Sequence, residues 1–162
     1  MTSVYLGLGS NIAPAANLRM AMSELRTRFG VVTASSVYRN QPVGFEGDDF
    51  LNFVVHFETE MPAVDICEVL NEIHARSGRE RGCKRYVART LDIDLLLYGD
   101  LISTVPPVRV PREDVLNYSF VLVPLAEIAP DLRHPETGRT MAEHLAALDL
   151  GQHPLERQDL AL

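Results

Sequence analysis

The chain has 162 residues, the length of one globular domain, and 46% hydrophobic residues, an ordinary value for such a domain. No apolar run is long enough to span a membrane, and the net charge of −7 argues against general nucleic-acid binding. The two cysteines, Cys67 and Cys83, match no zinc or redox motif, so we expect a reduced cytoplasmic protein. The first residues show no basic region followed by an apolar stretch, so we expect no signal peptide.

The first sixty residues are expected to form a strand, a helix and two further strands. The predicted ranges are 3–8 for the first strand, 14–29 for the helix, and 31–38 and 50–60 for the other strands. The segment 39–49 contains Pro42, Gly44 and Gly47 and is expected to be a mobile loop.

A second helix is predicted over residues 62–77, because Pro62 suits its first turn and Gly78 its end. A basic stretch follows this helix. Residues 76–89 contain six basic side chains and one acidic one, so this window carries +5 and the rest of the chain −12. Such a stretch is typical of a protein that binds a small polyanion, although a solvated charged loop is the alternative.

Residues 89–99 predict a strand that carries two acidic side chains on one face. Asp92 and Asp94 would lie on that face, with Cα atoms roughly 6.6 Å apart at ~3.3 Å rise per residue. The opposite, apolar face suits a core and consists of Leu91, Ile93, Leu95 and Leu97. Two carboxylates on a buried face repel each other and need a cation, either Mg²⁺ or a nearby arginine. An edge strand with a solvated polar face is the alternative.

The remaining segments are less regular. Residues 101–110 are expected to be extended, 111–117 to form a short helical turn, 120–128 to form a helix or a strand, and 151–162 to be a loosely held tail of the single domain, 1–162. The order β-α-β-β-α-β over the first hundred residues predicts an α+β, ferredoxin-like fold with a mostly antiparallel sheet. Both helices would then cover one face of this sheet and leave the other for a site.

Other motifs are weaker. Gly7-Leu8-Gly9 lacks the third glycine of a dinucleotide-binding fingerprint, and the chain has no P-loop sequence. His74 is expected at the rim of a site or on the surface, and the scattered histidines 56, 134, 144 and 153 are expected on the surface. Phe50 and Phe120 are either core residues or rings that stack on a planar heterocycle.

The sequence resembles the 6-hydroxymethyl-7,8-dihydropterin pyrophosphokinase family of folate biosynthesis. The resemblance covers roughly residues 3–140 and rests on Arg89-Thr90-Leu91-Asp92-Ile93-Asp94 with Leu97-Tyr98-Gly99. It extends to Gly9-Ser10-Asn11, to Ser35-Ser36-Val37-Tyr38-Arg39, to Phe50-Leu51-Asn52, to Val110-Pro111 and to the segment 120–130.

The resemblance implies an enzyme that transfers pyrophosphate from ATP to the hydroxymethyl group of the pterin and releases AMP. It implies that Asp92 and Asp94 hold two Mg²⁺ ions and that Arg79 and Arg89 act in catalysis. The implied pterin site consists of Asn40, Val43, Phe50, Asn52 and Phe120. The implied ATP site consists of Asn71, His74, Arg81, Arg89 and Arg112. The partners would be these small molecules, without nucleic acid or membrane, and the protein a monomer or weak homo-oligomer.

The chain also departs from the family pattern. Asn71 and His74 stand for a glutamine and a glutamate, Tyr86 for a tryptophan, Arg112 for a histidine, and Tyr118 for an arginine. Two alternatives therefore stay open: a catalytically weak paralogue that binds a pterin or nucleotide, and a pyrophosphokinase with altered pterin specificity.

Overall fold

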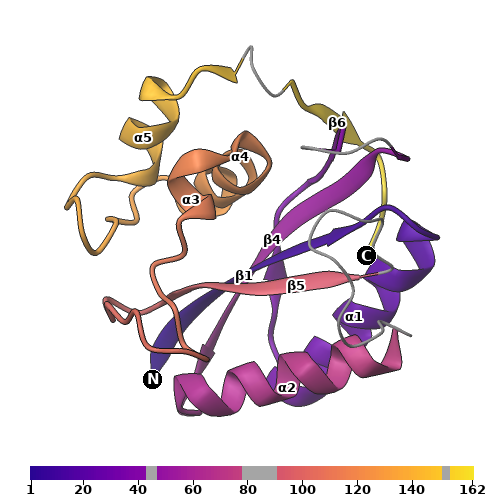
Figure 1. Ribbon diagram of the computed structural model, residues 1–162, viewed down its shortest axis with the longest axis horizontal. Helices are drawn as coiled ribbons and strands as arrows, with labels where there is room; N and C mark the ends of the chain where they lie inside the picture. Colours follow the sequence, from indigo (N-terminus) through magenta and orange to yellow (C-terminus); the bar gives the residue numbers. More distant parts are fainter. Residues whose placement is uncertain (43–46, 78–90, 151–153) are drawn as a thin grey trace.

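A computed structural model describes residues 1–42, 47–77, 91–150 and 154–162. The described elements come in the following order along the chain (Figure 1): β1 (Thr2–Ser10), α1 (Pro14–Phe29), β2 (Thr33–Ala34), β3 (Val37–Asn40), β4 (Phe50–Thr59), α2 (Ala63–Arg76), β5 (Asp92–Tyr98), α3 (Asp114–Asn117), α4 (Ser119–Ile128), α5 (Met141–Ala147) and β6 (Glu156–Gln158).

The six strands form one sheet in the order β5-β1-β4-β3-β6, with β2 also paired to β4. Every pairing between them is antiparallel. Strand β1 lies between β4 and β5, so the first strand of the chain is an interior strand, and β5 lies at an edge of the sheet. The arrangement confirms the expected ferredoxin-like fold.

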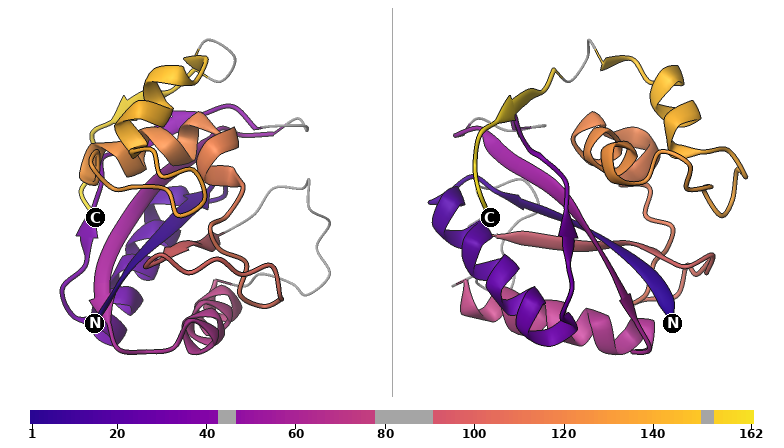
Figure 2. Two further views of the ribbon diagram at one scale, coloured as in Figure 1. Left: turned by 90° about the vertical axis from the view of Figure 1, so that its left-hand side faces the viewer. Right: turned by 180° about the vertical axis from the view of Figure 1, so that it is seen from behind.

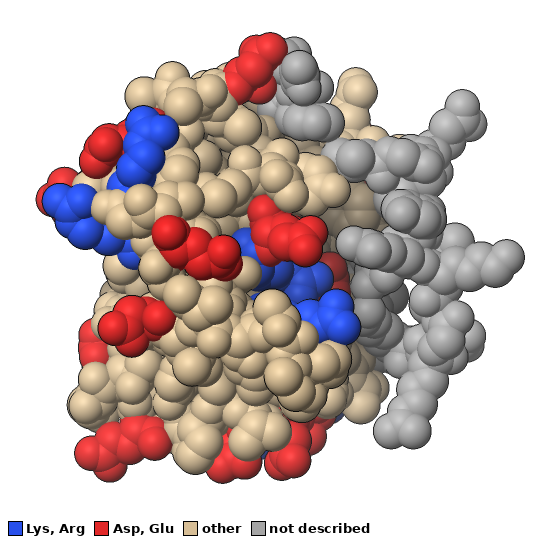
Figure 3. All heavy atoms as spheres, turned by 60° about the vertical axis from the view of Figure 1, so that its left-hand side comes forward, with Lys and Arg blue, Asp and Glu red and all other residues tan. Residues whose placement is uncertain are grey.

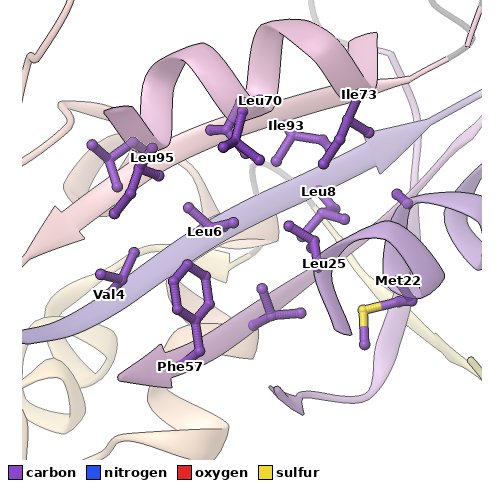
Figure 4. Packing of buried hydrophobic residues seen from close by; sticks show 14 of the residues in the cluster. Val4, Leu6, Leu8, Met22, Leu25, Phe57, Leu70, Ile73, Ile93 and Leu95 are labelled. Atoms are coloured by element: carbon purple, nitrogen blue, oxygen red, sulfur yellow. The ribbon is translucent and has the colours of Figure 1, made fainter. Parts of the chain in front are cut away.

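Helices cover both faces of the sheet, in two groups on opposite sides (Figure 2). On one face, side chains of β1, β4 and β5 pack against α1 and α2; Leu6, Leu25 and Ile73 belong to this cluster (Figure 4). On the other face, Tyr5, Val54 and Leu97 pack against α3, α4 and α5. The second face is therefore partly covered, where we expected it to be open.

The predicted second strand is divided into β2 and β3 by Ser35 and Ser36. The Oγ of Ser35 accepts a hydrogen bond from Val54 N at 3.0 Å, in place of a backbone carbonyl. The backbone N–H of Ser36 donates to the Glu127 carboxylate on α4 at 2.7 Å. These bonds interrupt the ladder and tie this edge of the sheet to α4.

The apolar face that we predicted for the acidic strand is correct for Leu91, Ile93 and Leu95, which pack with α1 and α2. It is wrong for Leu97. The register between β1 and β5 shifts by one residue at Tyr5 and Leu6, so Leu96 and Leu97 both pack in the cluster of the opposite face.

The last third of the chain has more structure than we expected. Residues 119–128 are a helix, and Thr140 opens α5 with a capping box to Glu143. Within residues 101–110, a single antiparallel bridge joins Ser103 to Val110. Strand β6 pairs with β3, where we expected a loose tail. No helix in the described part of the chain is long and apolar enough to cross a membrane.

Candidate active site

The candidate site begins with a row of cross-strand neighbours. Asp92 on β5 pairs with Gly9 on β1, Gly9 pairs with Asn52 on β4, and Asn52 pairs with Tyr38 on β3. Directly opposed residues of a sheet point to the same face. The predicted metal ligand and the predicted pterin ligand therefore share one face of the sheet, with a glycine between them.

Gly7 and Gly9 leave β1 without side chains on this face of the sheet. A Cβ atom on Gly9 would lie 2.5 Å from Asn52 Oδ1, which is too close for any real contact. A Cβ on Gly7, opposite Asp94, would lie 3.4 Å from the Leu96 side chain, an ordinary distance. Gly9 is therefore required by the position of Asn52, whereas Gly7 is not required to the same degree.

Asn52 is held by a second amide. Its Nδ2 donates to Asn40 Oδ1, and Asn40 Nδ2 donates in turn to the carbonyl of Gln41 at 3.0 Å. Both side chains are buried. These bonds fix the orientation of the two amide groups, because each donor has a defined acceptor.

Arg112 provides the positive charge that the two aspartates require. Its Nη2 lies 3.4 Å from Asp94 Oδ1, and its Nε donates to Asp114 Oδ2 at 3.3 Å. Burial alone would lower the pKa of Arg112, but Asp94, Asp114 and Asp92 raise it above its usual value. Basic side chains accordingly lie among acidic ones near the middle of the face in Figure 3.

His74 on α2 contacts the acidic strand directly. Its Nε2 accepts a hydrogen bond of 2.9 Å from the backbone N–H of Ile93, the residue between the two aspartates. We expected His74 at the rim of a site or on the surface; its side chain is half-buried beside the acidic strand. For His134 a surface position was wrong, because this side chain is 4% exposed and its Nδ1 accepts a bond from Glu136 N.

The two phenylalanines of the predicted pterin site occupy different elements. Phe50 is the first residue of β4, and Phe120 is the second residue of α4; both are half-buried. The ring of Tyr118 stacks on that of Phe120, with centroids 5.0 Å apart and planes 17° from parallel. Tyr118 therefore supports an aromatic surface where the family pattern has an arginine.

The remaining predicted site residues are distributed as follows. Asn71 is exposed on α2, three residues before His74. Val43, Arg79, Arg81 and Arg89, as well as Tyr86, lie outside the described residues.

The donor set suits Mg²⁺ better than a transition metal. Among the described residues no group of three or more His, Cys, Asp or Glu side chains is arranged to hold a metal ion. Asp92 and Asp94 offer only oxygen atoms, and the Asp94 side chain is 27% exposed. Mg²⁺ is usually held by one or two carboxylates together with water and substrate phosphates, so the residues present fit this ion.

Two contributors were not predicted from the sequence. Asp114 pairs with Arg112, and its position two residues after Arg112 is the one feature of the sequence that connects the two. Glu127 accepts hydrogen bonds from Ser36 and from the Tyr38 hydroxyl, the latter at 2.5 Å, and so fixes α4 against β3. Burial and the Glu127 hydrogen bond raise the pKa of Tyr38 to about 12.

The antiparallel ferredoxin-like sheet and its helices define an α+β domain. The two carboxylates at the sheet edge and the buried amides beside them suit small polar ligands. The model of the family "7,8-dihydro-6-hydroxymethylpterin-pyrophosphokinase (HPPK)" matches residues 5–130, and the chain belongs to this family.

Two curated relatives share the name 2-amino-4-hydroxy-6-hydroxymethyldihydropteridine pyrophosphokinase. The protein of Methylorubrum extorquens is 43% identical over 153 residues, which are 92% of this chain and 95% of the relative. That of Pseudomonas aeruginosa is 37% identical over 148 residues, which are 89% of this chain and 90% of the relative.

The fold also resembles solved structures. The HPPK-DHPS protein of Plasmodium falciparum, wild type with pteroate, superposes with a TM-score of 0.71 at 13% identity. The match covers 91% of this chain but 42% of that one, so the likeness concerns the fold of part of the larger protein.

Proposed function

We propose that the chain transfers pyrophosphate from ATP to 6-hydroxymethyl-7,8-dihydropterin in folate biosynthesis and releases AMP. The observation that carries the proposal is the match of the family model to residues 5–130, which includes both aspartates of β5. The two relatives of that name match this chain over about nine-tenths of their own length.

Asp92 and Asp94 would hold two Mg²⁺ ions, which when bound would neutralise the charge of the ATP phosphates. Arg112 would bind phosphate oxygens, together with Arg79, Arg81 and Arg89. An arginine fork suits this task because it offers paired N–H donors to two oxygens. Asn71 and His74 would border the nucleotide; because His74 Nε2 accepts from Ile93 N, other atoms of its ring would face the ligand.

The pterin would lie against the amides of Asn40 and Asn52, near Val43 and between the rings of Phe50 and Phe120. A pterin carries N–H donors and ring acceptors at one edge, and buried amides can pair with both kinds of group. Its planar ring suits stacking between two aromatic side chains.

In the reaction, the hydroxymethyl oxygen attacks the β-phosphorus in line. A bond from this oxygen to the β-phosphorus forms, and the bond from the β-phosphorus to the oxygen that bridges to the α-phosphorus breaks. AMP leaves with that oxygen, and the proton of the hydroxyl group is released to the solvent. Asp92 would help to orient the hydroxymethyl group. Transfer of this kind depends on positioning and electrostatic stabilisation.

The test is an assay for AMP with the purified protein, ATP, Mg²⁺ and 6-hydroxymethyl-7,8-dihydropterin. We expect AMP and the pyrophosphorylated pterin in equal amounts, and their loss in Asp94→Ala. Arg28→Gln is the control, since Arg28 pairs with Glu72 on the helix side of the sheet. The absence of AMP from the wild type would contradict the proposal.

Two observations favour a second candidate, a protein that binds the pterin with little turnover. Tyr118 packs on Phe120 in place of a charged residue, and Arg112 is engaged with Asp94 and Asp114. Calorimetric binding of the pterin without formation of AMP would identify this case. A panel of other pterins in the same assay would separate it from an altered substrate preference.

A further inference from the structure

The Arg112 side chain lies between two carboxylates that differ in their relation to it. Asp114 is two residues away along the chain and accepts a hydrogen bond from Nε at 3.3 Å. Asp94 belongs to β5, and its Oδ1 lies 3.4 Å from Nη2. The backbone N–H of Arg112 donates to Leu96 O at 2.9 Å, so the backbone is anchored while the far end of the guanidinium reaches Asp94.

These contacts conflict with a divalent cation on Asp94, because the guanidinium and the cation would compete for the same carboxylate and repel each other. The contact to Asp114 does not conflict, since Asp114 is outside the proposed ion site. Rotation about the terminal bonds of the side chain would move Nη2 away from Asp94 while Nε stays near Asp114. The Arg112 side chain is 36% exposed, so one side of it faces solvent and allows this movement.

We propose that Arg112 neutralises Asp94 in the metal-free protein, and that its guanidinium group moves to the nucleotide phosphates when a cation binds at the carboxylates. Asp114 would hold Nε of Arg112 in both states. The inference rests on the proposed function, since it takes the phosphate-bearing ligand to be ATP. Arg112 would then set the order of binding. A cation alone binds weakly because Arg112 competes for Asp94, and the nucleotide relieves this competition when its phosphates bind the guanidinium group.

The test measures binding without turnover, by calorimetry, with two probes: Mn²⁺ alone, and the α,β-methylene analogue of ATP without metal. In Arg112→Gln we expect Mn²⁺ alone to bind about tenfold more tightly, within the usual range for coupled sites, and the metal-free analogue to bind about tenfold more weakly. Opposite changes in the two affinities are the signature of one residue shared between two ligands.

Three variants serve as controls. Arg28→Gln removes an arginine from a distant ion pair and should change neither affinity. Asp94→Asn should abolish the Mn²⁺ site, which identifies the ion that is measured. If Arg112→Gln does not fold, as judged by circular dichroism, Arg112→Lys replaces it, and the weaker fit of an ammonium group should give smaller changes of the same signs.

Unchanged or weaker binding of Mn²⁺ in Arg112→Gln would overturn the proposal, and so would tighter Mn²⁺ binding with unchanged affinity for the analogue. Neither result depends on formation of AMP. If Arg112→Gln shows the two opposite changes in affinity while the wild type makes no AMP, this inference is therefore supported and the proposed function is contradicted.

Discussion

His74 and Ile93 are joined by a hydrogen bond of 2.9 Å from a backbone N–H to an imidazole nitrogen, across the contact between α2 and β5. The bond reaches the backbone of the acidic strand between Asp92 and Asp94, and thereby fixes the distance of the strand from the helix at the point where both carboxylates emerge.

Replacement of His74 by Phe should leave the Ile93 N–H without this acceptor. We expect a loss of about 1–2 kcal/mol in the free energy of unfolding, because a partly buried donor is left unsatisfied. We also expect kcat to fall more than KM rises, since the carboxylates lose part of their support. Chemical denaturation and steady-state kinetics measure the two effects. His74→Gln offers an acceptor again, so a Gln variant no better than Phe would count against this role.

Gly9→Ala should disturb the pterin site, because the added Cβ would lie 2.5 Å from Asn52 Oδ1 and force this amide out of place. We expect the affinity for the pterin to fall by about tenfold or more, a change of roughly 1.4 kcal/mol or more. Gly7→Ala is the matched control on the same strand, where the new methyl group would meet Leu96 at 3.4 Å. Equal effects of the two substitutions on pterin binding in calorimetry would refute the explanation.

Glu127→Gln should loosen the attachment of α4 to β3. Burial opposes ionisation of Glu127, but hydrogen bonds from Tyr38 and Ser36 outweigh it and lower the pKa of the carboxyl group. A lowered pKa means that the stabilisation is present above the pKa of the unfolded chain and is lost as the pH falls through the folded value. We expect a deficit of about 1 kcal/mol at pH 7, a modest figure because the carboxylate is exposed.

The pH dependence provides the check on this role of Glu127. Urea unfolding of the wild type and of Glu127→Gln should give different stabilities at pH 7, and the difference should shrink under acid conditions below the usual carboxyl range. A difference that stays constant between neutral and acid pH would show that the charge of Glu127 is not involved. Ser23→Ala, on the exposed surface of α1, serves as a control without a carboxylate.

Tyr118→Ala should weaken pterin binding, because Phe120 would lose the ring that stacks on it at 5.0 Å. Aromatic pairs contribute about 0.5–1.5 kcal/mol, so the affinity should fall by roughly two- to tenfold. Tyr118→Phe keeps the ring and should retain the affinity of the wild type. If the Phe variant binds the pterin as weakly as the Ala variant, the hydroxyl group rather than the stacking is responsible.

The sequence predicted those parts of the fold that depend on local pattern. The helix over 14–29 has the predicted bounds because its apolar spacing is regular, and the acidic strand was recognised from alternating residues. The predicted strand 31–38 was wrong in detail, since its interruption depends on the bond from Ser36 to Glu127, ninety-one residues away along the chain. Leu97 was assigned to the wrong face because the register shift arises from pairing with β1 and leaves no mark in β5 itself.

The residues of the candidate site also divide into those that a local motif marks and those that only the fold brings together. Motifs predict Asp92, Asp94 and Asn52 as site residues, and strand register explains why Asp92 and Asn52 flank Gly9. The pairing of Arg112 with Asp94 could not be predicted, because it requires the connection after β5 to fold back along the strand. The sequence assigns no role to Asp114 or Glu127, because each acts through a partner. Asp114 pairs with Arg112, two residues away, whereas the fold brings Glu127 to Tyr38.

The position of β1 between β4 and β5 has a consequence for the order of assembly. The row that joins Asp92, Gly9 and Asn52 is made by strands from three separate parts of the chain, and its outer members meet only through β1. Contacts between positions so distant in sequence form slowly, because closing a long loop costs entropy before the new contact can stabilise the chain. A nascent chain that has completed β4 but not β5 therefore holds the amide half of the site without its carboxylates. Asp92 joins this row only when β5 pairs with β1, and Phe120 on α4 follows later still along the chain.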